Sequence, residues 1–143
     1  MSRIKIEIPE TVLFTTEIRV RITDINYGNH VGNDAIVQII HEARAQFLAS
    51  QGFTELNVAG TSLIMSNLIV EFKKESFFGD RLTIKLCAGN ITNVSFDLFY
   101  SISTVRDSQE ILIVKAQTGM VCYDYVARKV SVITPGLLKI IQP

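Results

Sequence analysis

The loop between Asp24 and Gly32 contains three side chains that could act on a substrate. Asp24 carries a carboxylate, Asn26 an amide, and His30 an imidazole that can exchange a proton near neutral pH. This set suits general-base activation of water, with His30 as the base and Asp24 either orienting it or acting as the base itself. Each residue also has a structural interpretation, because Asp24 and Asn26 could bond backbone N–H groups in a turn, and His30 could bond backbone or face solvent.

The start of the next helix could supply donors for a developing negative charge. The first N–H groups of an α-helix have no partner within the helix and lie at the positive end of its dipole. We expect the helix to begin near Asn33 or Asp34, with one of these side chains as its cap. Gly32 would let a substrate approach the backbone closely. Such donors suit the carbonyl oxygen of an acyl group, and an ordinary capped helix is the structural alternative.

This helix is the only long helical pattern in the chain, and Gly52 is its expected left-handed terminator. Its apolar side chains share one broad face, which requires strands packed around it. Glu42, on the opposite face, is a further catalytic candidate, and a salt bridge or a contact with Arg44 or Gln46 is its structural alternative. The apolar face comprises Ile36, Ile39, Ile40, Ala43 and Phe47, widened by Val37 and Leu48.

Most of the remaining chain reads as β-strands separated by turn residues. The turns are short, which predicts that consecutive strands pair antiparallel. Gly119 should mark a bend or a bulge, and residues 137–141 form a short apolar tail. We therefore predict an α+β fold in a single domain, residues 1–143, with one long central helix wrapped by a curved antiparallel sheet of five or six strands. The expected strands span residues 11–22, 62–73, 81–88, 94–103, 110–123 and 129–133.

Composition narrows the class of protein further. Hydrophobic residues make up 48% of the 143 residues and charged residues 20%, as in a globular domain with a real core. Fourteen basic residues balance fourteen acidic ones, which argues against a general nucleic-acid or membrane-surface binder. No signal peptide or membrane span is evident, so we expect a cytoplasmic protein. Cys87 and Cys122 lack metal-binding or redox spacing and are expected to be buried free thiols.

The first strand, the loop and the helix together resemble a known family. The segment VRITDINYGNHVGND at residues 20–34, followed by HEAR at 41–44, is similar to the opening of hotdog-fold thioesterases of the 4-hydroxybenzoyl-CoA thioesterase type. Their typical pattern is V-R-x-x-D-x-D-x-x-G-H-V-N-N, with E-x-A-R in the helix. The segments VEF at 70–72, FGD at 78–80 and VCYD at 121–124 agree with this family.

The resemblance implies a hotdog fold and a homodimer or dimer of dimers, with the active site between subunits. It also implies hydrolysis of an acyl thioester of coenzyme A or acyl carrier protein, with no metal and no cofactor beyond the coenzyme A of the substrate. One position departs from the pattern, because the usual catalytic aspartate is Asn26 here. An amide can orient a water or donate to a carbonyl, but it cannot accept a proton from water at neutral pH. The usual mechanism therefore does not carry over unchanged.

Substrate-binding candidates lie in the loop and beside a later turn. Basic residues at that turn could meet the phosphates of coenzyme A, and solvated strand-end charges are the alternative. A further group of apolar side chains could line an acyl tunnel or pack in the core. The candidates are Tyr27, Gly32, Asn33 and Asp34 near the helix start, Lys73, Lys74 and Arg81 at the turn, and Met65, Leu68 and Phe77 for the tunnel.

Two other functions fit the same fold. An (R)-specific enoyl-CoA hydratase uses an Asp and a His in a loop that reads roughly D-x-N-P-x-H, whereas this chain lacks the Pro and has His30 one residue later. A non-catalytic acyl-thioester binder would follow if Asn26 had abolished hydrolysis. The three functions differ in product. A thioesterase releases free thiol, a hydratase forms a 3-hydroxyacyl thioester, and a non-catalytic binder forms no product. Fold alone cannot choose among them.

Overall fold

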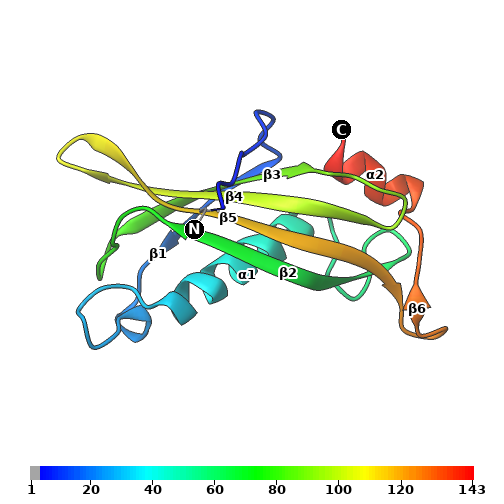
Figure 1. Cartoon of the computed structure of the whole chain (residues 1–143), viewed down its shortest axis with the longest axis horizontal. Coiled ribbons are helices and arrows are strands. Elements are labelled where there is room, and N and C mark those ends of the chain that lie inside the picture. Colours follow the sequence, from blue (N-terminus) through cyan, green and yellow to red (C-terminus); the bar gives the residue numbers. More distant parts are fainter. Residues whose placement is uncertain (1–3) are drawn as a thin grey trace.

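The computed structural model describes residues 4–143 as one antiparallel sheet and two α-helices (Figure 1). The long helix α1 and the sheet confirm the predicted α+β class. In chain order the elements are β1 (Phe14–Arg19), the 3₁₀ turn η1 (Ile22–Asp24), α1 (Asn33–Ser50), β2 (Ser62–Phe72), β3 (Arg81–Gly89), β4 (Ser95–Arg106), β5 (Gln109–Asp124), β6 (Lys129–Val130) and α2 (Pro135–Ile141).

The strands of the sheet lie in the order β1-β3-β4-β5-β2, and β6 adds to β5. Consecutive strands pair antiparallel from β3 to β6, as expected. The same expectation is wrong for β2 and β3, because β2 pairs with β5 at one edge and β3 lies beside β1. Residues 73–80, the crossing segment, span this gap instead of forming a hairpin. Its first amide, that of Lys73, donates to the Ile113 carbonyl at 2.8 Å, and its last carbonyl, that of Asp80, accepts from Val20 at 2.9 Å.

Helix α1 lies along one face of the sheet and buries its apolar side there (Figure 1). Phe47 is fully buried, and its ring lies 5.8 Å from that of Phe14 in β1. Burial of one such side chain contributes about 1.5–3 kcal/mol, so this face holds α1 on the sheet. Val37 is 38% exposed, so its assignment to the buried face was wrong. The confirmed members are Ile36, Ile39, Ile40, Ala43, Phe47 and Leu48.

The two ends of α1 differ in how well they match the prediction. Gly32 is the N-cap residue, and no side chain accepts a hydrogen bond from the first turn. The expected cap by Asn33 or Asp34 was therefore wrong, because both residues already lie within the helix. Gly52 adopts φ 85° just beyond the helix, which confirms the left-handed terminator.

The opposite face of the sheet is covered in part by residues 4–13, the N-terminal arm (Figure 1). Ile6 is almost completely buried and packs in a small cluster with Cys87 and Phe99. This cluster is separate from the main core between α1 and the sheet.

Several element boundaries differ from the prediction. The first strand ends at Arg19 and the chain turns at η1, which leaves Ile22 exposed, and the closing strand is shorter than expected. The apolar tail forms helix α2, capped by the Thr134 hydroxyl, which accepts the Leu137 N–H at 3.2 Å. Proline at the start of α2 suits the first helical turn.

Gly119 marks an irregularity, as predicted. The β2–β5 register shifts between Met65 and Asn67, directly opposite this glycine. A Cβ atom at Gly119 would lie 2.0 Å from Asn67 Oδ1 and 2.7 Å from Ser66 Oγ. A side chain at this position of β5 would therefore displace the side chains of Asn67 and Ser66 at the bulge.

Both cysteines are buried free thiols, as expected. Burial raises the pKa of the Cys87 and Cys122 thiols above the ordinary value, which keeps them protonated and inert at neutral pH. Within residues 4–143, no helix combines the length and apolarity of a membrane span. No cluster of potential metal ligands occurs in the same part of the chain.

Candidate active site

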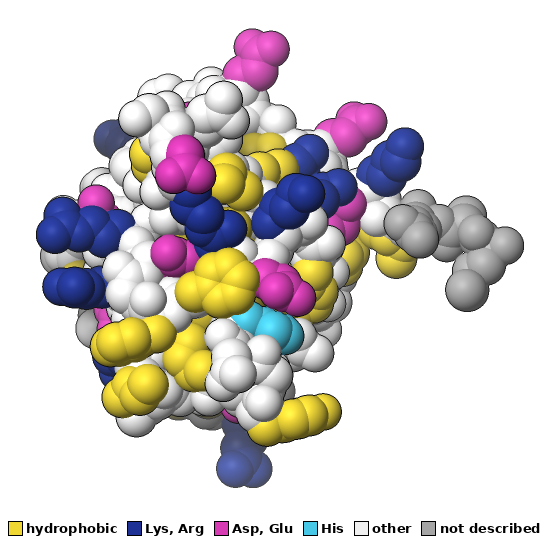
Figure 2. All heavy atoms as spheres, turned by 90° about the vertical axis from the view of Figure 1, so that its left-hand side faces the viewer, with side chains coloured by type: hydrophobic (Ala, Val, Ile, Leu, Met, Phe, Trp, Pro, Cys, Tyr) yellow, Lys and Arg dark blue, Asp and Glu magenta, His cyan; other side chains and the backbone are white. Residues whose placement is uncertain are grey.

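The loop, the start of α1 and the crossing segment enclose a pocket of about 230 Å³, here called the His30 pocket. These three segments and the β4–β5 hairpin meet at the left-hand end of the molecule in Figure 1. Figure 2 faces that end, where hydrophobic side chains gather beside acidic and basic ones. The walls of the pocket are His30, Val31, Asn33 and Ile36 from the loop and α1, residues 72–76, and Ile113 and Val114 from β5.

The His30 ring is held in one orientation. Its Nδ1 lies 3.1 Å from the carbonyl oxygen of Val31. A carbonyl oxygen can only accept, so Nδ1 carries the proton in this contact, and the neutral ring presents an unprotonated Nε2. That Nε2 lies 3.9 Å from Oε1 of Glu75, and both residues line the His30 pocket. The pocket therefore contains a potential base beside a carboxylate.

Glu75 was not among the predicted site residues. It lies in KKESFFGD, which the sequence pattern identifies only as a strand end followed by a turn. Its side chain is 64% exposed at the pocket mouth. The one signal in the sequence is its position, because Glu75 directly follows two lysines that are candidate phosphate-binding residues. Nothing in the sequence indicates that it meets His30.

The crossing segment that carries Glu75 is fixed from two sides. On one side, the Val31 N–H donates to the Ser76 carbonyl at 2.9 Å. On the other, Arg106 at the end of β4 donates to the Glu75 carbonyl at 2.9 Å and to Asp80 Oδ2 at 2.6 Å. The same guanidinium lies 4.9 Å from the centre of the Phe77 ring. Arg106 therefore ties the segment to the β4–β5 hairpin.

The N-terminus of α1, the positive end of its dipole, lies close to His30. The Gly32 N–H donates to the Asp24 carbonyl at 3.0 Å, and the Ile36 N–H begins the helical pattern at 3.1 Å from the Gly32 carbonyl. Within residues 4–143, the N–H groups between them, those of Asn33, Asp34 and Ala35, have no acceptor. Asn33 lines the His30 pocket. Because Asn33 lines the pocket at the positive end of the helix dipole, its N–H is a candidate donor for an acyl oxygen bound there.

Asn26 lies across the loop from His30. Its backbone N–H donates to the His30 carbonyl at 2.9 Å, and its side-chain Oδ1 accepts from the Gly28 N–H at 2.9 Å. The second contact is an Asx turn, which confirms the structural alternative for this side chain. A Cβ atom on Gly28 would lie 3.2 Å from His30 Nε2 and 3.3 Å from Asn26 Oδ1. Gly28 therefore lies between the two side chains and leaves the space there open.

Asp24 and Glu42 are not brought to His30. Asp24 is buried, and its carboxylate accepts from the backbone N–H of Arg21 at 2.9 Å and from the Arg21 guanidinium at 3.2 Å, which closes η1. Asp24 and Glu42 line a separate groove of about 360 Å³ between β1 and α1. Glu42 accepts a hydrogen bond from Gln46 at 3.0 Å, which is the local contact expected as its structural alternative.

Comparison with known proteins places this architecture in a family. The model of the thioesterase-like superfamily matches residues 20–141, most of the chain. The chain belongs to the thioesterase-like superfamily. The predicted resemblance to hotdog-fold thioesterases is thereby confirmed, and with it the prediction of an enzyme of this class.

Three individual proteins that this chain resembles are named as CoA thioester hydrolases or thioesterases. The chain is 28% identical over 126 residues to a 1,4-dihydroxy-2-naphthoyl-CoA hydrolase of Acaryochloris marina, covering 86% of this chain and 91% of the relative. The crystal structure of a 1,4-dihydroxy-2-naphthoyl-CoA thioesterase from Synechocystis is 26% identical and superposes with a TM-score of 0.78, covering 90% and 94% of the two chains. A 4-hydroxybenzoyl-CoA thioesterase mutant in complex with 4-hydroxybenzoyl-CoA, 16% identical, superposes at 0.80 over 90% and 98%. These superpositions confirm the hotdog fold.

The remaining predicted residues of this thioesterase-like protein divide between the pocket and the surface. Lys73 and Lys74 line the His30 pocket. Arg81 points elsewhere, exposed and 3.9 Å from Glu17 on β1. Tyr27 is fully exposed at the loop tip. The three candidates for an acyl tunnel, Met65, Leu68 and Phe77, do not line this pocket, whereas the apolar Val31, Ile36, Phe72, Ile113 and Val114 do.

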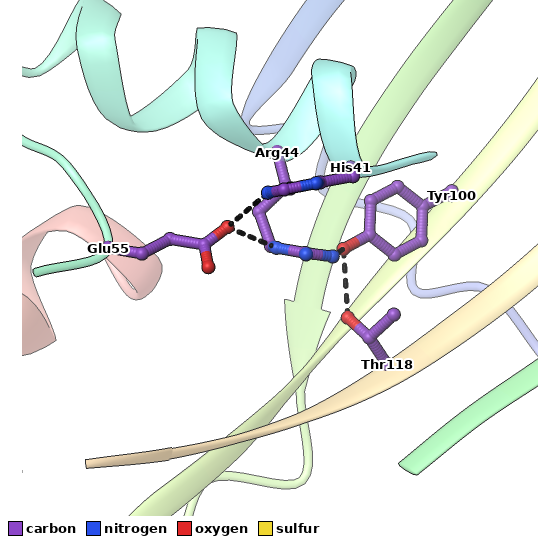
Figure 3. A network of polar contacts seen from close by, with 5 residues as sticks. All are labelled: His41, Arg44, Glu55, Tyr100 and Thr118. Atoms are coloured by element: carbon purple, nitrogen blue, oxygen red, sulfur yellow. Dashed lines mark hydrogen bonds and ion pairs between the residues drawn. The ribbon is translucent and has the colours of Figure 1, made fainter. Parts of the chain in front are cut away.

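A polar network, buried at Arg44, Tyr100 and Thr118, fixes α1 to the sheet (Figure 3). Arg44 is 5% exposed, and its Nε donates to Glu55 Oε1 at 2.8 Å, while His41 Nε2 lies 3.5 Å from the same oxygen. Arg44 also donates to the Tyr100 hydroxyl at 3.3 Å, which lies 2.8 Å from Thr118 Oγ1. Burial raises the pKa of Tyr100. These contacts link α1 to β4, β5 and the loop after the helix.

Proposed function

We propose that this protein hydrolyses an acyl-CoA thioester in the His30 pocket. The observation that carries the proposal is the meeting of the His30 imidazole, the Glu75 carboxylate and the start of α1 around one small cavity. Thioester hydrolysis needs an activated water and donors for the oxygen that gains charge. Membership of the thioesterase-like superfamily supports this reaction class.

In the proposed mechanism, His30 acts as the general base. A water between His30 Nε2 and Glu75 gives a proton to Nε2 while its oxygen bonds to the thioester carbon. The N–H groups at the start of α1 stabilise the resulting oxyanion. The C–S bond then breaks, the proton returns from His30 to the sulfur, and free acid and thiol are released. Glu75 stabilises the imidazolium formed in the first step, and Asn26 orients the water or donates to the substrate.

The His30 pocket also suggests the acyl group. Its apolar side chains surround a cavity of only about 230 Å³, which suits a compact acyl group better than a long aliphatic chain. The two relatives named for 1,4-dihydroxy-2-naphthoyl-CoA have the CoA thioester of an aromatic acid as their named substrate. We propose aromatic acyl-CoA thioesters as the substrate class. We further propose a homodimer or dimer of dimers, with no cofactor beyond the coenzyme A of the substrate.

The test is thiol release from a panel of acyl-CoA thioesters that pairs aromatic acyl groups with aliphatic ones of short, medium and long chain. A thiol reagent reports free coenzyme A, and mass spectrometry identifies the acyl product. We expect free acid and thiol, fastest for aromatic acyl groups. A 3-hydroxyacyl thioester from an enoyl-CoA, without thiol release, would instead support the hydratase. Binding without any turnover over the whole panel would support a non-catalytic binder.

A further inference from the structure

Two adjacent lysines at the mouth of the His30 pocket have different surroundings. Lys73 and Lys74 both line the pocket. The ammonium of Lys73 lies 2.9 Å from Oε2 of Glu71, and its side chain is 40% exposed. Lys74 is exposed and has no ion-pair partner within residues 4–143. The two positive charges are therefore not equally available to a ligand.

Glu71, the partner of Lys73, is committed to a second contact. Its Oε1 accepts the backbone N–H of Ile6 at 2.6 Å. The Ile6 N–H first, and then Lys73, hold the pKa of the Glu71 carboxyl below its ordinary value. Lys115, which lies opposite Glu71 in the β2–β5 register, donates to the Ile6 carbonyl at 3.3 Å. Both backbone polar groups of Ile6 are thus held by charged side chains of the sheet.

These contacts fasten the N-terminal arm to the outer face of the sheet. Ile6 inserts its side chain against Cys87 and Phe99 and is almost completely buried. Glu71 connects the N-terminal arm to the pocket. One of its carboxylate oxygens accepts the Ile6 N–H of the arm, and the other forms the ion pair with Lys73. Turning Lys73 towards a ligand would break its ion pair with the Glu71 carboxylate.

We propose that Lys74 binds a phosphate group of coenzyme A and that Lys73 instead anchors the N-terminal arm through Glu71. This assignment rests on the proposed function. A lysine that already forms an ion pair has part of its charge compensated, whereas an unpaired lysine offers its full charge and three donors to a phosphate. The two neighbouring residues thus serve different purposes, one in substrate affinity and the other in the docking of the arm.

The matched variants Lys73→Met and Lys74→Met test this division with two substrates that carry the same acyl group. One is the acyl-CoA thioester, and the other is the N-acetylcysteamine thioester, which has no phosphate. We expect Lys74→Met to raise KM for the acyl-CoA by about tenfold, as for loss of one charge-assisted contact, and to leave kcat/KM for the phosphate-free thioester unchanged. Lys74→Arg should restore most of the affinity. Lys73→Met should change KM by no more than about twofold for either of the two thioesters.

The second readout concerns the arm. Lys73→Met should speed hydrogen exchange at the Ile6 amide and lower Tm, whereas Lys74→Met should change neither. Equal KM effects of the two variants, or an effect of Lys74→Met on both substrates, would overturn the assignment. Should the wild type release no thiol from any acyl-CoA, the proposed function fails separately. Calorimetric titration with coenzyme A then decides the lysine assignment, because only Lys74→Met should weaken binding of coenzyme A. Absence of binding to the wild type would also overturn the assignment.

Discussion

His30 Nε2 and Glu75 Oε1 lie 3.9 Å apart across the mouth of the His30 pocket, although one belongs to the loop before α1 and the other to the crossing segment after β2. The distance is too long for a direct hydrogen bond and leaves room for a bridging water. Because Nδ1 of His30 faces a carbonyl oxygen, its Nε2 is the nitrogen that can receive a proton.

Replacing either member of this pair should slow the chemical step. We expect His30→Ala to lower kcat at least about a hundredfold and Glu75→Gln about tenfold, with small changes in KM. Glu110→Gln, at an exposed glutamate outside the pocket, is the matched control and should behave as wild type. Steady-state kinetics with the best acyl-CoA of the panel measure the effect. If both pocket variants kept the kcat of the wild type, the assignment of His30 as the general base would be wrong.

The amide at position 26 offers a second test of the site. Asn26→Asp keeps an oxygen that can accept the Gly28 N–H, so the loop should retain its conformation. The new carboxylate would lie beside His30 and the start of α1, and we expect it to raise kcat severalfold by adding a base. Asn26→Ala, which loses the turn contact and the polar group, should lower kcat. An Asp variant that folds normally but is slower than wild type would show that the amide itself is required.

Arg106 should act as a positioning residue for Glu75. Arg106→Ala removes three contacts to the crossing segment, and we expect kcat to fall about tenfold or more, because small displacements near reacting groups are costly. Arg106→Lys, which keeps the charge for Asp80, should recover part of the rate. Lys129→Ala, in β6 at the other end of the sheet, is the control.

The network around Arg44 should contribute to stability and not to chemistry. Tyr100→Phe removes the hydroxyl that Arg44 and Thr118 share, and we expect the free energy of unfolding to fall by about 1–2 kcal/mol. Arg44→Ala should cost about 2–3 kcal/mol, because it also removes the hydrogen bond to Glu55 and leaves only His41 beside that carboxylate. Urea denaturation measures both changes. A double-mutant cycle of Tyr100→Phe with Thr118→Val should show coupling, and simple additivity would argue against the network.

Stability should fall at alkaline pH. Burial raises the pKa of Tyr100, Cys87 and Cys122 above their ordinary values of 10.0, 9.0 and 9.0. The folded protein therefore keeps these protons at a pH where the unfolded chain has released them, so stability is complete below about pH 9 and decreases as the pH rises further. Urea denaturation between neutral and alkaline pH tests this dependence. The slope should be smaller in Tyr100→Phe, and a free energy that rises with pH would contradict the prediction.

The local elements of this fold could be predicted because each follows from neighbouring residues. The apolar spacing from Ile36 to Phe47 defines α1, and Gly52 marks its end. The motif from Asp24 to Arg44 was sufficient to indicate the family. Boundaries were less well predicted where backbone geometry competes with pattern, as at the Gly32 cap and in the tail that forms α2.

What the sequence by itself determined is the long helix, the strands apart from their exact bounds, the hotdog class and the presence of a polar loop before the helix. Only the tertiary structure decided which polar groups meet. The pairing of β2 with β5 sends the crossing segment across the end of the sheet, which brings Glu75 to His30, and Arg106 holds it there. Asp24, although close to His30 in sequence, turns to Arg21 instead. Such contacts depend on strand order, a long-range property that no local spacing of residues encodes.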